Sequence, residues 1–178
     1  MLKNLFCFMC VIVLGGAMTA VDVAAQGFSL PPLLMESDAF EDGGVVPMRY
    51  AGRGDNVQPG FTFSNAPDNT ASYAIIFHDL DVALGGMTGD VLHWLAWNIP
   101  VSAGGIPEGS LPPGSVQGTN LMGQTADFGP GAPPGPRYHH YVFELYALSE
   151  NLDLPLSLIH ISEPTRPRLI SYAVFCLK

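Results

Sequence analysis

The sequence predicts a mainly all-β fold, an antiparallel sandwich with long loops that cross between its strands. Three eight-residue segments are dense in aromatic and β-branched side chains, which is typical of strands. Glycine occurs 20 times and proline 16 times in 178 residues. This frequency leaves little room for long helices, because proline removes a helical hydrogen bond. With 48% hydrophobic and 13% charged residues, the chain is expected to fold rather than to remain disordered.

The predicted strands follow one another with turn-forming residues between them. In chain order they are residues 61–63, 72–79, 92–99 and 141–148. Pro59 and Gly60 open the first strand, and Pro100 ends the third. Residues 101–138 carry many glycines and prolines and are expected to be mostly loop. Loops of that length in a compact domain are usually functional.

Residues 1–25 have the three parts of a secretory signal peptide. Lys3 supplies the basic start, residues 5–14 form an unbroken apolar run, and residues 23–25 are small, with Gln26 as the expected mature start. The alternative is an uncleaved membrane anchor, although glycine and threonine dilute the apolar stretch. We expect a periplasmic or secreted protein with no stable membrane insertion after signal cleavage.

The sequence pattern changes after Pro155. The domain is predicted at residues 26–155, a stretch without cysteine, so core burial rather than disulfides must hold it together. Residues 156–178 contain the run SLIHISEPTR, which resembles the translation of a sequencing adapter, and we predict a non-native tail there. The true C-terminal sequence would then be missing. The alternative is a natural tail with one apolar strand at residues 169–177.

Acidic side chains outnumber basic ones by 16 to 7, and the formal net charge is −9. A protein that binds the phosphate backbone of DNA or RNA needs a basic face, so we expect no nucleic-acid partner. The same balance disfavours adhesion to anionic membranes, whose surface attracts basic segments.

Aspartate, histidine and tyrosine side chains stand near the ends of the predicted strands. The candidate cluster consists of Asp79, Asp81, His93, His139 and Tyr141. Taken alone, each has a structural explanation, because an aspartate before a glycine-rich loop is usually a turn former. Together they could line a pocket in which imidazoles, a hydroxyl and backbone N–H groups hold an anion or a polar head group. The two aspartates are expected to orient the imidazoles and to favour their charged form.

The alternation of side chains along a strand assigns these residues to faces of the sheet. It groups His93 with Leu95 and Trp97. It also turns His78 to the face opposite Asp79.

Other chemistries fit this cluster less well. Two histidines and two aspartates could bind a metal, but the ligands would come from separate strands without an HxH spacing. After Asp79 and Asp81, the next ligand positions of a calcium loop fall on Ala83 and Gly85. Nucleophilic catalysis lacks a G-x-S-x-G motif and a cysteine in residues 26–155. We therefore expect no metal and no cofactor.

Five sequence blocks, in order along the chain, resemble the phosphatidylethanolamine-binding proteins, in particular their bacterial Raf-kinase-inhibitor-like branch. The blocks are HDLD (78–81), HWLAWNIP (93–100), IPEGS (106–110), GAPPG (131–135) and YHHYVFELYAL (138–148). The resemblance implies a Greek-key β-sandwich, whose C-terminal helix is expected to be missing from this chain. It also implies a pocket that takes phosphate, phosphorylated groups or small anions.

The resemblance assigns individual residues to that pocket. Matched motif by motif, they are Asp79, Asp81, His93, Pro133, Pro134, His139 and Tyr141. Three positions depart from the family pattern. Leu80 replaces the proline between the two aspartates, His140 replaces an arginine, and Ala132 stands where bacterial members often have cysteine.

The expected function is therefore that of an exported ligand-binding module that captures a small phosphorylated or anionic ligand without catalytic turnover. One alternative is an inhibitor or modulator of a partner kinase or protease, acting through the loop surface at residues 101–138. A third hypothesis is a hydrolase that uses the aspartate and histidine set.

Overall fold

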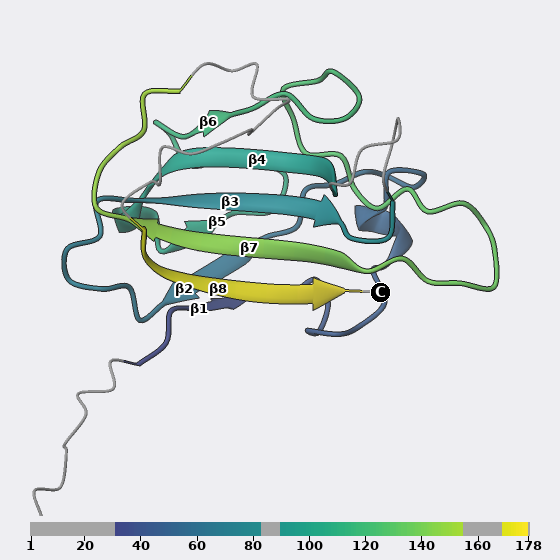
Figure 1. The fold of residues 1–178 in the computed structure, drawn as a ribbon, viewed down its shortest axis with the longest axis horizontal. Helices are drawn as coiled ribbons and strands as arrows, with labels where there is room; N and C mark the ends of the chain where they lie inside the picture. The colour runs from purple at the N-terminus through teal and green to yellow at the C-terminus, as the bar shows by residue number, and fades with distance from the viewer. Residues whose placement is uncertain (1–30, 83–89, 155–168, 178) are drawn as a thin grey trace, which may run out of the picture. The chain divides into compact units, whose positions relative to one another are not determined.

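Two antiparallel β-sheets form the protein in this computed structural model, which describes residues 31–82, 90–154 and 169–177 (Figure 1). The smaller sheet has the order β1-β2-β5 and the larger one the order β6-β4-β3-β7-β8. In chain order the strands are β1 (Leu34–Glu36), β2 (Phe61–Ser64), β3 (Ser72–Asp79), β4 (Val91–Pro100), β5 (Gly105–Ile106), β6 (Val116–Gln117), β7 (Tyr141–Leu148) and β8 (Leu169–Leu177). The predicted all-β class and antiparallel sandwich are confirmed.

Helical structure is confined to single turns in the described part of the chain. The 3-10 helices η1 (Met48–Tyr50) and η3 (Val101–Ala103) are three residues each. Frequent prolines account for this, since a proline blocks the hydrogen bond that would extend a helix. The expected signal peptide at residues 1–25 lies outside the described residues, and the extent of the domain on that side stays a prediction.

The main hydrophobic core lies between the two sheets and is rich in aromatic rings. Phe61 of β2 packs against Phe143 of β7 at 4.9 Å between ring centroids. Phe63 packs against Tyr73 at 5.0 Å, again from one sheet to the other. Phe77 stacks on Phe143 at 3.9 Å within the larger sheet. Each buried aromatic ring contributes about 1.5–3 kcal/mol of transfer free energy, so these contacts hold the sheets together.

A second, smaller cluster covers the opposite face of the larger sheet. Its buried members are Ala74, Leu95, Trp97 and Leu148. Because both faces of this sheet are covered, β3 and β4 have nearly continuous apolar sequences instead of a strict alternation. Asp79 and Tyr141 stand at the ends of β3 and β7.

Residues 169–177 form β8, which pairs antiparallel with β7 from Tyr141↔Leu177 to Leu148↔Leu169. The strand lies at the edge of the larger sheet (Figure 1). The structure therefore has the strand that the alternative prediction placed at residues 169–177. Whether residues 156–178 are native to the protein stays a prediction.

Candidate functional site

Asp79 is the last residue of β3, and its buried carboxylate organises the site. Its Oδ2 atom lies 2.8 Å from Nδ1 of His139, and its Oδ1 atom accepts the backbone N–H of Asp81 at 2.9 Å. In the pairing of β3 with β7, Asp79 stands opposite Tyr141. Since a carboxylate only accepts hydrogen bonds, Nδ1 of His139 carries the hydrogen, and Nε2 is the nitrogen that can meet a ligand.

Tyr141 begins β7 and ties the site to the long loop before it. Its hydroxyl oxygen accepts the backbone N–H groups of Gly131 at 3.3 Å and Ala132 at 3.1 Å. Burial, together with the charge of Asp79, raises the pKa of Tyr141 to about 12. The phenol therefore stays neutral at physiological pH, and its position fixes the loop amides beside the histidines.

His93 in β4 is 4% exposed and packs against aromatic rings on three sides. Its ring centroid lies 5.2 Å from Phe77, 5.3 Å from Tyr141 and 5.8 Å from Phe128. Its Nδ1 atom lies 2.7 Å from the carbonyl oxygen of Phe128, so this nitrogen must donate. Burial lowers the pKa of His93, although the Phe128 carbonyl and Asp79 oppose this.

The low pKa of His93 changes the role expected for it. A neutral imidazole with its hydrogen on Nδ1 offers a lone pair on Nε2, which is an acceptor. His93 was expected to be a charged donor, but burial favours the neutral ring near pH 7.

A β-bulge in β4 brings His93 to this face. Phe77 pairs with Trp94 and His78 with Leu92, so β4 has one more residue than β3 at His93. The predicted grouping of His93 with Leu95 and Trp97 is wrong, because those two belong to the cluster on the opposite face. His93 instead faces Phe77 and Tyr141 in the interior of the sandwich.

Asp81 lies beside this group without joining it. Its carboxylate accepts the backbone N–H of His140 and lies 2.8 Å from His140 Nδ1. These bonds from His140, the backbone one first, lower the pKa of Asp81. The histidine that replaces the arginine of the resembling family is thus engaged by the second aspartate, at the surface.

The other predicted residues take separate places. Pro133 and Pro134 are exposed, in the loop that follows the Gly131 and Ala132 amides. His78 lies on the other side of the sheet, where its Nδ1 is 2.7 Å from Asp90. The structure therefore brings together Asp79, His93, His139 and Tyr141, with Asp81 at the side and the two prolines outside.

Sequence reasoning missed the segment of residues 127–132 as a unit. Besides the Phe128 carbonyl and the two loop amides, it contains Asp127, which is buried, and whose pKa burial raises to about 7. Two hydrogen bonds hold the segment to residues 52–56. Gly129 N–H donates to Asn56 Oδ1 at 2.8 Å, and Gly52 N–H donates to the Pro130 carbonyl at 2.8 Å. A side chain at Gly129 would overlap the Tyr50 carbonyl oxygen. A lone aspartate in a loop rich in glycine and proline gives no sequence signal that it will be buried.

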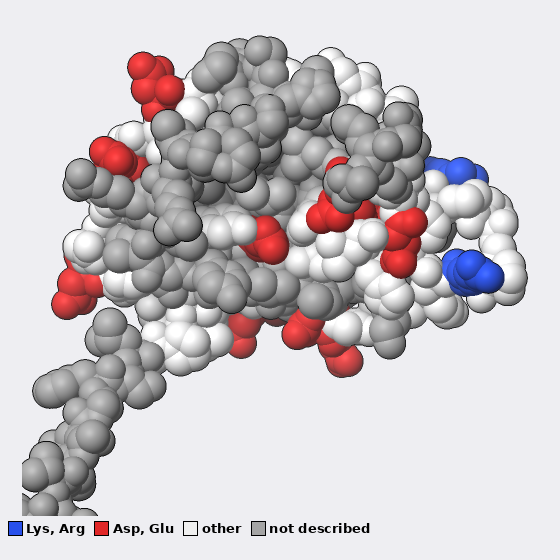
Figure 2. All heavy atoms as spheres, viewed as in Figure 1, with Lys and Arg blue, Asp and Glu red and all other residues white. Residues whose placement is uncertain are grey.

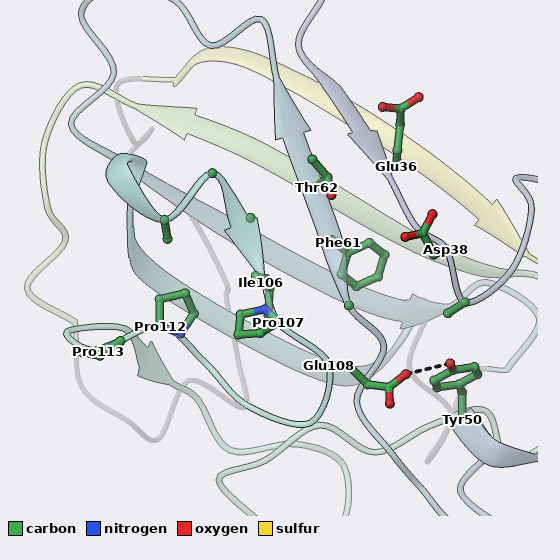
Figure 3. A pocket seen from close by; sticks show the side chains of 15 residues that line it. Glu36, Asp38, Tyr50, Phe61, Thr62, Ile106, Pro107, Glu108, Pro112 and Pro113 are labelled. Carbon is green, nitrogen blue, oxygen red and sulfur yellow. Dashed lines mark hydrogen bonds between the residues drawn. The ribbon is translucent and has the colours of Figure 1, made fainter.

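A separate groove of about 690 Å³ lies over the smaller sheet (Figure 3). It is lined by Glu36 and Asp38 at one side, by Gly104–Pro107 and by the exposed Thr62. Tyr50 closes one end, where its hydroxyl donates to Glu108 at 2.8 Å. None of the predicted site residues lines this groove.

The acidic composition is visible on the surface. Figure 2 shows acidic side chains spread over one face, with basic side chains at one end of it. In the part of the chain that the structure describes, no three His, Cys, Asp or Glu side chains are grouped so that they could hold a metal ion. The same residues include no helix with the length and apolar character needed to cross a membrane.

The profile of the family described as phosphatidylethanolamine-binding protein matches residues 36–174. This chain belongs to that family. The similarity covers both sheets and all four residues that the structure brings together.

Relatives and solved structures agree with this assignment. LppC of Mycobacterium tuberculosis, named as a candidate lipoprotein, is 35% identical over 137 residues, which are 77% of this chain and 66% of LppC, slightly under two thirds. A UPF0098 protein of Methanothermobacter thermautotrophicus is 38% identical over 125 residues, 67% of this chain and 79% of that protein.

Two crystal structures of family members have the same fold. CT736 of Chlamydia trachomatis, a candidate PEBP homologue, superposes with a TM-score of 0.71 and 27% identity, over 82% of this chain and 95% of CT736. YbcL of E. coli, described as a member of the mammalian PEBP family, gives a TM-score of 0.69 and 25% identity, over 83% of this chain and 97% of YbcL. The solved structures therefore agree with the family assignment, since this chain has the fold of the phosphatidylethanolamine-binding proteins.

Proposed function

We propose that this protein is an exported binding module that captures a phosphoryl group or another small anion, without turnover, at His93, His139 and Tyr141. The observation that carries the proposal is the contact between Asp79 and His139 beside two backbone amides. This arrangement leaves Nε2 of His139 as the nitrogen that can meet a ligand, beside a loop whose two amides are bonded to the Tyr141 hydroxyl oxygen.

The two histidines would play different parts in capture. With Nδ1 bonded to Asp79, a charged His139 can donate from Nε2 to an anion oxygen. A neutral His93 can accept at Nε2 the hydrogen of a singly protonated phosphate. The pair therefore suits a phosphoryl group that carries one P–OH and one P–O⁻.

Access to this place is from the His139 side. The side chain of His139 is 18% exposed, while Asp79, His93 and Tyr141 are buried. A ligand would therefore meet His139 first, and the exposed Pro133 and Pro134 lie in the loop before it in the chain.

Isothermal titration with inorganic phosphate tests the proposal. His139→Ala and His93→Ala should each weaken binding by about 1.5–3 kcal/mol, the range for hydrogen bonds to charged groups. His78→Ala is the matched control, because His78 bonds to Asp90 on the opposite face. Equal losses for His78→Ala and His139→Ala, or no phosphate binding by the unmodified protein, would contradict an anion site here.

Export is supported by the relative LppC, whose name describes it as a candidate lipoprotein. The basic start and apolar run of residues 1–25 point the same way. Mass spectrometry of protein recovered from the periplasm of a Gram-negative host should give a mature N-terminus near Gln26. An intact Met1 in the membrane fraction would overturn this part of the proposal.

A second candidate function, modulation of a partner enzyme, is favoured by the groove over the smaller sheet. The groove takes part of its lining from the loop surface at residues 101–138 (Figure 3). Arg49 and Tyr50 both bond to Glu108, which holds that loop in place. A stable complex with a kinase or protease that survives His93→Ala would support this function and separate it from anion capture.

A further inference from the structure

Asp127 is a buried carboxyl group without a partner. The residue is 8% exposed, and neither side-chain oxygen has a hydrogen bond in the described part of the protein. The residue borders a narrow gap, too small to hold a water molecule, whose walls include Phe40, Phe77 and Phe143. A charged carboxylate is strongly disfavoured in such surroundings, because no group there replaces its hydration.

No cation compensates Asp127 from the elements packed around it. The titratable side chain among the described residues that line the same space is Tyr50, whose hydroxyl donates to Glu108 instead. Arg53 contacts the same segment, but its Nε donates to the Gly131 carbonyl. His93 is bonded to the carbonyl of Phe128, the next residue along the chain.

Asp127 begins the short segment that positions both His93 and Tyr141. Phe128 contacts His93 twice, through its carbonyl oxygen at 2.7 Å from Nδ1 and through its N–H, which donates to the His93 carbonyl at 3.3 Å. Three residues further on, the amides of Gly131 and Ala132 donate to the Tyr141 hydroxyl. A movement of the backbone at Asp127 would disturb these contacts.

We propose that Asp127 is a proton-dependent positioning residue of the anion site, a role that rests on the proposed function. While its carboxyl group is neutral, the segment of residues 127–132 stays seated, with the Phe128 carbonyl on His93 and two amides on Tyr141. When the carboxyl group loses its proton, the charge draws the side chain toward water, and the segment withdraws from both residues. Anion affinity then falls.

Burial raises the pKa of Asp127 from 3.8 to about 7, so its carboxyl group changes its charge near neutral pH. The pKa is raised because the apolar surroundings favour the neutral acid over the charged carboxylate. Below the midpoint the segment is seated, and above it the seated form costs the free energy of a buried charge.

The first test is made without phosphate, by NMR. Amide signals of Gly131 and Ala132 are followed from pH 5.5 to 8.5 in the unmodified protein, in Asp127→Asn and in Asp90→Asn, the control at the surface of the opposite face. We expect a transition near pH 7 in the unmodified protein and in Asp90→Asn, and its loss in Asp127→Asn.

The second test measures phosphate affinity at pH 6 and pH 8. One pH unit above the midpoint leaves roughly a tenth of the carboxyl groups neutral, so the part of the pH effect due to Asp127 is about tenfold. Asp127→Asn should remove that part of the pH effect. If phosphate does not bind at all, the proposed function fails, while the amide titration still decides the role of Asp127.

A third measurement needs no substitution and covers the case in which Asp127→Asn does not fold. The carboxyl carbon of Asp127 in the unmodified protein should titrate near pH 7. A midpoint at or below about 4.5, close to that of an ordinary aspartate, would overturn the proposal. So would an unchanged Gly131 and Ala132 transition in a folded Asp127→Asn protein.

Discussion

Two aspartate–histidine pairs stand next to each other where β3 ends and β7 begins, Asp79 with His139 and Asp81 with His140. Oδ2 and Nδ1 are 2.8 Å apart in both pairs. The side chains of the first pair are 4% and 18% exposed, whereas those of the second are 40% and 54% exposed. Ion pairs at the surface are screened by water and contribute little, while removing one partner from a buried pair leaves the other group unsatisfied. The same two residue types therefore make a buried pair in one place and a surface contact in the other.

The largest loss of stability should come from breaking the buried pair. Asp79→Ala leaves the His139 ring and the Asp81 N–H without their acceptor, and should lower the free energy of unfolding by about 3 kcal/mol, the lower end for buried pairs. Urea denaturation measures this. Asp81→Ala is the control and should leave the midpoint almost unchanged, so equal losses for the two variants would contradict the comparison.

A third aspartate shows what burial does when no histidine is present. The pKa of Asp127 is raised to about 7, so stability is lost as pH rises from about 4 to about 7, where the unfolded chain has released a proton that the folded protein keeps. Relative to the unmodified protein, Asp127→Asn should therefore be more favourable at pH 8 than at pH 4 by about 4 kcal/mol, since the cost of burying the amide is the same at both pH values. Thermal unfolding at both pH values gives the result. A gain that does not depend on pH would show that the carboxyl group does not titrate in this range.

The smallest effect is expected at His140. His140→Ala removes the exposed ring that bonds to Asp81 but keeps the backbone N–H that bonds to the same carboxylate. Phosphate affinity should change by less than about twofold, as expected for a surface pair. A loss as large as that of His139→Ala would mean that the exposed pair belongs to the binding site, and titration calorimetry on both variants would show it.

The long strands were predictable from the sequence because their signal is local. Residues 72–79 and 141–148 have the predicted bounds, since apolar β-formers continue up to clear turn residues. The strands β1, β5 and β6 were not predicted, because two or three residues become a strand only through pairing with a neighbour.

Four of the seven predicted site residues lie together in the structure, and their geometry could not be predicted. The resemblance to the family gave Asp79, His93, His139 and Tyr141, and the structure brings these four together. The bulge at His93 has no glycine or proline to announce it, so alternation assigned the wrong face. The pKa of His93 was also out of reach, because it depends on burial by residues distant in the chain.

His93 is the unpaired residue of the bulge between β4 and β3. The residues on either side of it pair with β3, but His93 itself has no partner in that register. It belongs to the strand through its chain connections and not through the ladder of hydrogen-bonded pairs. A change of residue type here removes no pair from that register, although it removes the ring that packs against Phe77, Tyr141 and Phe128.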